Sequence, residues 1–479
     1  MKLENITLSN YRSIHSVQLP IKRVKGSNTY CLFGVNESGK SSFLKGLSLY
    51  DEKDLKYPED YFDDSEPVSL IFEYKTNESN VKVLREKLKS KFDFPKNLLS
   101  HISFSKVEIE ISHSATAEKE RSITETISFK KSKFPNYRLS TEEKIEKTEN
   151  KDDVLDLNEF MSEHLPKHFW TYSHNLMLWK ATDEFLIKDE IDLDEFMEKP
   201  YDVSIPLANS FILAGIPSDK IKDKLSKLKG PTSIRNLESL LSEKVTEHIT
   251  NVWNNHPIDI KFEINERKIT LLVEDVGVKY KAKTTSQRSD GFRQFISFLL
   301  SISAENSNDE LSDTIMLLDE PETHLHPQAQ VDLMNELIKM SMTNDNMVFY
   351  ATHSNYMIDK RNLERNIKVV KMSNEKTELE YLSQKNSTYS EVNYTVFNIP
   401  TSDYHNELYG YLEDVEPKKL NSIEKDRKWI NELSGKTETV SLPKYIRNSI
   451  HHPENDSNKA FSERQLRKSI EILRKLKYN

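Results

Sequence analysis

A phosphate-binding motif lies near the N-terminus. The segment that runs from Gly34 to Ser41 reads G-V-N-E-S-G-K-S, which satisfies G-x-x-x-x-G-K-[ST] and directly follows the apolar run 29–33. In such a loop, backbone N–H groups surround phosphate oxygens, Lys40 neutralises charge on the β- and γ-phosphates, and the Ser41 hydroxyl ligates Mg²⁺. The motif predicts a nucleotide site with these residues: Gly34, Asn36, Glu37, Ser38, Gly39, Lys40, Ser41 and Ser42.

A pair of carboxylates follows a second apolar run. Asp319 and Glu320 come directly after Ile-Met-Leu-Leu at 315–318, which is typical of a buried parallel strand. Beside a phosphate loop, Asp319 can hold the Mg²⁺ shell together with Ser41, and Glu320 can polarise the attacking water. We therefore predict Asp319 and Ser41 as metal ligands, and Glu320, Lys40 and His353 as catalytic groups.

Two further segments complete the set. Ser289 and Gly291 precede an apolar helix, and a serine and a glycine at a helix N-terminus offer a hydroxyl, free N–H groups and a positive dipole end to an anion. In isolation this pattern is an ordinary N-cap. His353 follows the next apolar run, 347–351, where a ring nitrogen could reach a γ-phosphate. Both interpretations depend on the order of the four motifs along the chain.

The elements that must position these residues alternate between strands and helices. Strands are predicted at the N-terminus and over 29–33, 68–74, 314–318, 347–351 and 367–372, with a hairpin over 258–273 and helices after residue 41 and after residue 289. The predicted fold is α/β. We expect four parts: a first core part (1–75), an α/β insert (76–250), a second core part (251–375) and an α-rich C-terminal domain (376–479).

Composition sets outer limits. The 479 residues carry a formal net charge of −9, which gives no global argument for nucleic-acid binding but leaves room for a local basic patch. Cys31 is the single cysteine, so no intramolecular disulfide can form, and a reducing compartment is expected. The sequence shows no signal peptide and no apolar run near 18 residues. These features predict a cytoplasmic protein without a membrane partner.

The ordered motifs resemble the ABC ATPase superfamily, in its branch with RecF, SMC and overcoming-lysogenisation-defect (OLD) proteins. The segment E-P-E-T-H-L-H-P at 320–327 resembles that branch's Walker B and D-loop, and Thr352-His353-Ser354 resembles its switch region. Arg12 stands where such proteins place a nucleotide-contacting arginine. The resemblance implies a head that binds ATP and Mg²⁺ and pairs with a second copy, whose Ser289 and Gly291 clamp the nucleotide, in a homodimer or a larger even-numbered oligomer. In this family a Q-loop glutamine is expected after the first helix, but none can be placed in this sequence. The residue that would couple nucleotide binding to the insert is therefore unassigned.

The remainder of the chain narrows the subtype. The sequence contains no sustained heptad repeats, so long coiled-coil arms are not expected. The insert is too large and too mixed in character for the ATPase subunit of a transporter. Asp414-Val-Glu416 is the nearest approach to a Toprim nuclease motif and lies in a charged, loop-like context, so we exclude that domain. The stretch from Asn393 to Tyr409 resembles stand-alone ATPase subunits of bacterial anti-phage systems such as Septu, which pairs with an HNH nuclease. That resemblance implies a separate nuclease partner and possible contact with DNA or RNA.

Two alternatives stay open. Arg447 and His452 match the R-x4-H pattern of HEPN ribonucleases, in which a cation orients a phosphodiester and an imidazole moves the 2′-hydroxyl proton. The chain would then be a toxin whose ribonuclease is gated by its own ATPase. A HEPN-like fold could instead serve dimerisation or docking. The other alternative is a RecF-like DNA-repair ATPase. The histidines show no zinc spacing, and no structural metal is expected.

Overall fold

The computed structural model describes two compact units. One comprises residues 1–357 and 364–382, and the other comprises 358–363 and 383–479. Within these ranges the described residues are 1–50, 55–115, 120–150, 152–164, 174–180, 182, 185–252, 257–278, 281–288, 290–303, 313–342, 345–382 and 387–478.

A six-stranded sheet carries the predicted chemistry. Its order is β11 (Asn175–Lys180), β16 (Thr314–Asp319), β17 (Met347–Thr352), β3 (Thr29–Phe33), β18 (Asn366–Lys371) and β19 (Thr377–Tyr381). All neighbours pair in parallel except β18 and β19, which are antiparallel. The apolar runs of β3, β16 and β17 are almost wholly buried, as expected for strands covered on both faces. The strands predicted at 29–33, 314–318 and 347–351 are confirmed.

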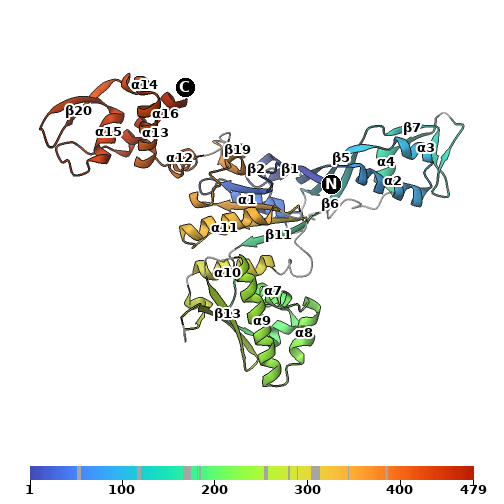
Figure 1. The fold of residues 1–479 in the computed structure, drawn as a ribbon. Helices are drawn as coiled ribbons and strands as arrows, with labels where there is room; N and C mark the ends of the chain where they lie inside the picture. Colours follow the sequence, from blue (N-terminus) through green and yellow to red (C-terminus); the bar gives the residue numbers. More distant parts are fainter. Residues whose placement is uncertain are drawn as a thin grey trace. The chain divides into compact units, whose positions relative to one another are not determined.

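An antiparallel sheet covers the helix that follows the phosphate loop. Its order is β2 (Ile14–Pro20), β1 (Lys2–Tyr11), β4 (Val68–Lys75), β5 (Phe104–His113) and β6 (Arg121–Phe129). The helix α1 (Lys40–Ser48) packs against β1 and also against β16 and β17, so one hydrophobic core joins both sheets (Figure 1). The predicted N-terminal strand, the strand at 68–74 and the first helix are confirmed.

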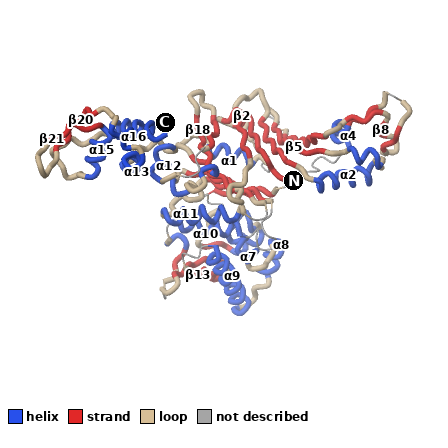
Figure 2. Tube along the Cα trace, turned by 45° about the horizontal axis from the view of Figure 1, so that its top comes forward, coloured by secondary structure: helices blue, strands red, loops and turns tan. Residues whose placement is uncertain are grey.

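The range predicted as the insert, 76–250, contributes to two lobes around β11, and the second lobe continues to residue 303, within the range predicted as the second core part. The first lobe extends from β5 and β6 and carries helices α2 and α4 (Figure 2). The chain then returns to the six-stranded sheet as β11 before it forms the second lobe, in which β12, β14 and β13 make a sheet. β11 was not predicted from the sequence, and its pairing with β16 joins segments that are far apart in the chain.

The elements of the two lobes have the following bounds. The first lobe contains α2 (Glu78–Phe92), α3 (Lys96–His101), β7 (Lys133–Pro135), β8 (Tyr137–Leu139), β9 (Ile145–Lys147), β10 (Val154–Asp156) and α4 (Leu157–His164). The second contains β12 (Glu190–Asp192), α5 (Leu193–Glu198), α6 (Pro200–Val203), α7 (Ile205–Leu213), α8 (Ser218–Ser226), α9 (Pro231–Val252), β13 (Ile258–Asn265), β14 (Lys268–Asp275), β15 (Lys283–Thr284) and α10 (Asp290–Ser303). The helix α11 (Pro327–Met340) then joins β16 to β17. The predicted hairpin and the helix after residue 289 are confirmed.

The C-terminal unit is a small helical bundle with a hairpin. It contains α12 (Tyr389–Thr395), α13 (Ser402–Val415), α14 (Pro417–Asn421), β20 (Lys425–Ile430), β21 (Thr437–Ser441), α15 (Leu442–His451) and α16 (Glu463–Tyr478). Its core is formed by apolar side chains of α13, α15 and α16. The predicted C-terminal domain began at residue 376. In the structure, β19 pairs with β18 of the first unit, and the continuous part of the second unit begins at residue 383. The segment around Asp414 is the end of helix α13 rather than a loop.

Candidate nucleotide site

The phosphate loop joins β3 to α1. Gly39 caps the helix with a φ of 104°, in the left-handed region that residues with a Cβ rarely adopt. Lys40 is buried, and its Nζ donates hydrogen bonds to the carbonyl oxygens of Gly34 (3.1 Å) and Val35 (3.0 Å). Burial lowers the pKa of Lys40, while three carboxylates near the end of β16 oppose that shift. The ammonium group therefore lies folded over the loop that the motif predicted.

The two residues predicted to bind a metal ion lie next to each other. Ser41 Oγ donates a hydrogen bond to Asp319 Oδ1 (2.9 Å), which links the start of α1 to the end of β16. A hydroxyl and a carboxylate oxygen held this close suit adjacent positions in an octahedral Mg²⁺ shell, which prefers oxygen ligands. These two residues thus fit the cation that the sequence predicts. Ser42 lies in the first turn of α1.

The catalytic candidates stand side by side at the ends of β16 and β17. His353 Nε2 lies 3.3 Å from Glu320 Oε1. Glu320 has a positive φ of 50°, and its backbone N–H donates to Ala351 O (3.0 Å) of β17, so its backbone is held against the neighbouring strand. Burial lowers the pKa of His353, and the Lys40 ammonium lowers it further. A neutral imidazole can donate one N–H to an anionic oxygen.

A second carboxylate, Glu322, supports this pair and had no predicted role. Glu322 is 5% exposed, and its Oε1 accepts hydrogen bonds from Thr352 Oγ1 and from His353 N (3.3 Å). Within the described chain, Glu322 Oε2 is buried without a hydrogen-bond partner. Burial raises the pKa of Glu322 to about 7. Glu322 therefore fastens the segment after β17 to the end of β16, and its burial favours the protonated form.

Thr377, the first residue of β19, supports the phosphate loop through hydrogen bonds. Thr377 Oγ1 donates to Ser38 O (3.1 Å) and lies 2.8 Å from Ser13 Oγ. A Cβ on Gly39 would overlap the Thr377 hydroxyl, so this close approach needs glycine as well. The other predicted loop residues, Asn36 and Glu37, are exposed, whereas Ser38 is buried. No local signal in the sequence marks Thr377, because its partners are more than 300 residues away.

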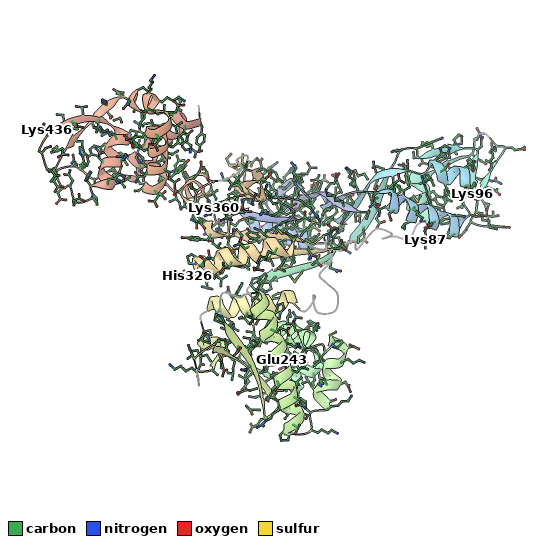
Figure 3. All side chains as sticks on the ribbon, in the orientation of Figure 1. Lys87, Lys96, Glu243, His326, Lys360 and Lys436 are labelled. Atoms are coloured by element: carbon green, nitrogen blue, oxygen red, sulfur yellow. The ribbon has the colours of Figure 1, made fainter. Side chains whose placement is uncertain are left out.

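The signature segment is described only in part. Ser289 lies outside the described residues, and α10 begins at the residue after it. Gly291, in the first turn of α10, lies so close to the D-loop that a Cβ there would overlap the carbonyl group of His324. His326 caps α11, its Nδ1 accepting from Gln328 N (3.3 Å), at the position labelled in Figure 3. The signature helix and the D-loop are thus packed together.

The two remaining predicted groups have separate partners. In the C-terminal unit, Arg447 forms an ion pair with Glu413 (3.1 Å) and stacks over the Tyr409 ring. His452 lies 3.6 Å from Glu454 and is largely exposed. Each group is engaged by its own carboxylate, so no described contact unites them as a phosphodiester site. In the other unit, Arg12 lies in the β1–β2 turn, where it pairs with Asp60.

Comparison with known proteins gives this site a family. Residues 1–358 match the AAA ATPase domain, which is most of the chain and includes every motif of the nucleotide site. The chain belongs to the AAA ATPase domain family. Together with the ordered motifs, this match makes it an ABC-type P-loop ATPase of the branch that includes OLD and SMC proteins. The predicted α/β head with a P-loop is confirmed.

Curated relatives of this ATPase match over shorter stretches. An uncharacterized protein of Methanocaldococcus jannaschii, MJECL43, is 26% identical over 118 residues, which cover 24% of this chain and 30% of the relative. The Old nuclease of Escherichia phage P2 is 30% identical over 113 residues, which cover 23% of this chain and 19% of the nuclease. This ATPase therefore spans under a third of the length of these two relatives.

Solved structures that resemble this ATPase include two SMC heads. An SMC head bound to the C-terminal winged-helix domain of ScpA has 14% identity and a TM-score of 0.42, over 80% of this chain and 98% of that one. The SMC head domain of Thermotoga maritima has 10% identity and a TM-score of 0.37, over 80% and 100%. In the described part of this ATPase, no helix is both long and apolar enough to cross a membrane.

Proposed function

We propose that this ATPase is a nucleotide-driven switch that pairs with a second copy around ATP and controls a separate nuclease. The observation that carries the proposal is the meeting of Lys40, Ser41 and Asp319 with the Glu320–His353 pair at the ends of three parallel strands. Such a cluster can bind a triphosphate and polarise a water against it.

The proposed roles follow from the geometry. Lys40 exchanges its two loop carbonyls for β- and γ-phosphate oxygens. Ser41 and Asp319 hold Mg²⁺, which neutralises phosphate charge when bound. Glu320 orients the attacking water, and a neutral His353 donates an N–H to the γ-phosphate.

The partner copy would complete the site. The contact between Gly291 and His324 makes the signature turn and the D-loop one surface. A second copy would therefore present both to the same nucleotide, with Ser289 and Gly291 binding phosphate oxygens. Hydrolysis would remove the γ-phosphate that bridges the copies and so reopen the pair.

Control of a nuclease is proposed from two lines of support. The match to an Old nuclease covers only a fifth of that protein, which is compatible with an ATPase part whose nuclease lies elsewhere. The resemblance to Septu-type ATPases favours an HNH nuclease in bacterial anti-phage defence. The C-terminal unit, with its own core, is the proposed element for docking or dimerisation. The separate partners of Arg447 and His452 favour this role over a ribonuclease.

The test measures mass and partners. Light scattering coupled to gel filtration should show a doubled mass with ATP and Mg²⁺ for the wild type, and no change for Lys40→Ala. A nuclease that co-purifies from the native host, with activity that changes on adding ATP, would support the switch. Constant mass with ATP would contradict the pairing. ATP-dependent binding to DNA ends or gaps without any associated nuclease would favour a RecF-like repair ATPase instead.

A further inference from the structure

The loop between α1 and β4 is fastened to the β1–β2 turn. The backbone N–H of Arg12 donates to Asp60 O (3.0 Å). The Asn10 side chain adds three bonds, because its Nδ2 donates to the carbonyls of Asp63 (2.9 Å) and Glu66 (2.6 Å) and its Oδ1 accepts from Asp63 N (2.7 Å). The turn that carries Arg12 and the loop that carries Asp60 are therefore one rigid corner.

Asp60 is the buried anion of this corner. The residue is 2% exposed, and its two carboxylate oxygens are both used. Oδ1 accepts from Arg12 Nε (2.7 Å), and Oδ2 accepts from Lys56 N (2.9 Å). Burial alone would raise the pKa of Asp60, but the Lys56 N–H and the Arg12 guanidinium outweigh it, and the pKa is lowered. Asp60 is thus held ionised, with charge-assisted bonds that fix the arginine in place.

The ion pair with Asp60 uses Arg12 Nε and leaves the two terminal guanidinium nitrogens available. About a third of the Arg12 side chain is exposed (35%), and its guanidinium group lies over the Tyr11 ring, 5.3 Å from the ring centre. Asp60 engages Nε, and no described residue makes a hydrogen bond with the two terminal nitrogens. A guanidinium oriented through Nε presents those two nitrogens as a planar fork, which suits phosphate oxygens.

We propose that Asp60 is a positioning residue that holds the Arg12 fork ready for a phosphate of the bound nucleotide. The inference rests on the proposed function and on the expectation, implied by the family resemblance, that Arg12 contacts the nucleotide. Asp60 is the residue that orients Arg12, and it lies in the segment between α1 and β4. A Q-loop glutamine would be expected in that segment, but the sequence has none that could be placed there.

The same loop reaches the strands that lead to the first lobe. Tyr61, which follows Asp60, is buried, and its hydroxyl donates to Ser114 O (2.7 Å) at the end of β5. β5 and β6 run from this point to the lobe that carries α2 and α3, on which Lys87 and Lys96 are labelled in Figure 3. A shift of Arg12 on nucleotide binding would therefore pull on Asp60 and, through Tyr61, on the strands that support the lobe.

A double-mutant cycle tests the positioning role. Binding of a fluorescent ATP analogue is measured for the wild type, Arg12→Ala, Asp60→Asn and the double variant, with Asp63→Asn as the matched control. The Asp63 carboxylate lies in the same loop but is exposed and contacts Ser65 rather than arginine. We expect each single variant to weaken binding about tenfold, the double variant to bind no worse than Arg12→Ala, and the control to match the wild type.

The outcomes separate the two proposals. Wild-type affinity in Asp60→Asn, or a double variant whose loss is the product of the two single losses, would overturn the positioning role. If Lys40→Ala binds the analogue as tightly as the wild type, the nucleotide site itself is misassigned.

The relay from Arg12 through Asp60 and Tyr61 to β5 and β6 has a test of its own. ATP should change hydrogen exchange in β5 and β6 of the wild type but not of Tyr61→Phe, at similar nucleotide affinity. An unaltered exchange response in Tyr61→Phe would refute the relay.

Discussion

The protonation of Glu322 makes a quantitative prediction about stability. Burial raises the pKa of this carboxyl group from 4.5 to about 7, whereas the unfolded chain exposes it. Between these values the folded state holds a proton that the unfolded state has lost, so the free energy of unfolding falls as pH rises. The stabilising contribution is complete below pH 4.5 and is lost through pH 7. At about 1.4 kcal/mol per pKa unit, this contribution is on the order of 3 kcal/mol, and most of it disappears between pH 5 and 8.

The substitution Glu322→Gln should remove that dependence. Glutamine keeps an oxygen that can accept from Thr352 and His353 but carries no titrating proton. Hydrogen exchange of β17 amides, corrected for the intrinsic rate at each pH, measures the free energy of opening this sheet. From pH 5 to 8, we expect the free energy of opening to fall by roughly 2–3 kcal/mol more in the wild type than in the variant.

A matched control separates this effect from general acid–base changes. Glu263 is exposed on β13, so Glu263→Gln should keep the wild-type pH dependence. Parallel curves for the wild type and Glu322→Gln would refute the reasoning, because the buried carboxyl group would then titrate as it does in the unfolded chain.

Three further predictions concern the nucleotide cycle. Lys40→Ala should abolish detectable ATP binding, since it removes the cation over the loop; calorimetry that finds wild-type affinity would contradict this. Glu320→Gln should bind ATP but slow hydrolysis by about 100-fold or more and accumulate the paired form, measured by phosphate release and light scattering; a wild-type rate would show that Glu320 is not the residue that polarises water. Gly291→Ala should retain ATP binding but lose ATP-dependent pairing, because the new Cβ would displace the His324 backbone of the D-loop; intact pairing would mean that this contact is dispensable.

Local features of the chain were sufficient to predict the first layer of the site. The runs over β3, β16 and β17 are continuously apolar, because both faces of these strands are covered, and each run ends at residues for which we propose a role in binding or hydrolysing ATP. The phosphate loop could be identified because its glycines, lysine and hydroxyl are consecutive. The predicted cluster of Lys40, Asp319 and His353 then follows from the rule that the carboxyl ends of parallel strands share one edge of the sheet.

The supporting layer could be found only in three dimensions. Asp60 meets Arg12 across 48 residues, and Thr377 meets Ser38 across 339, so neither pair leaves a local pattern. The role of Glu322 depends on burial, which sequence letters do not report, and β11 joins the central sheet by pairing with a strand far along the chain. A motif whose residues are contiguous can be recognised in the sequence, so the sequence indicates which groups are able to react. What holds those groups in place is decided by packing between distant segments, which exists only in the folded protein.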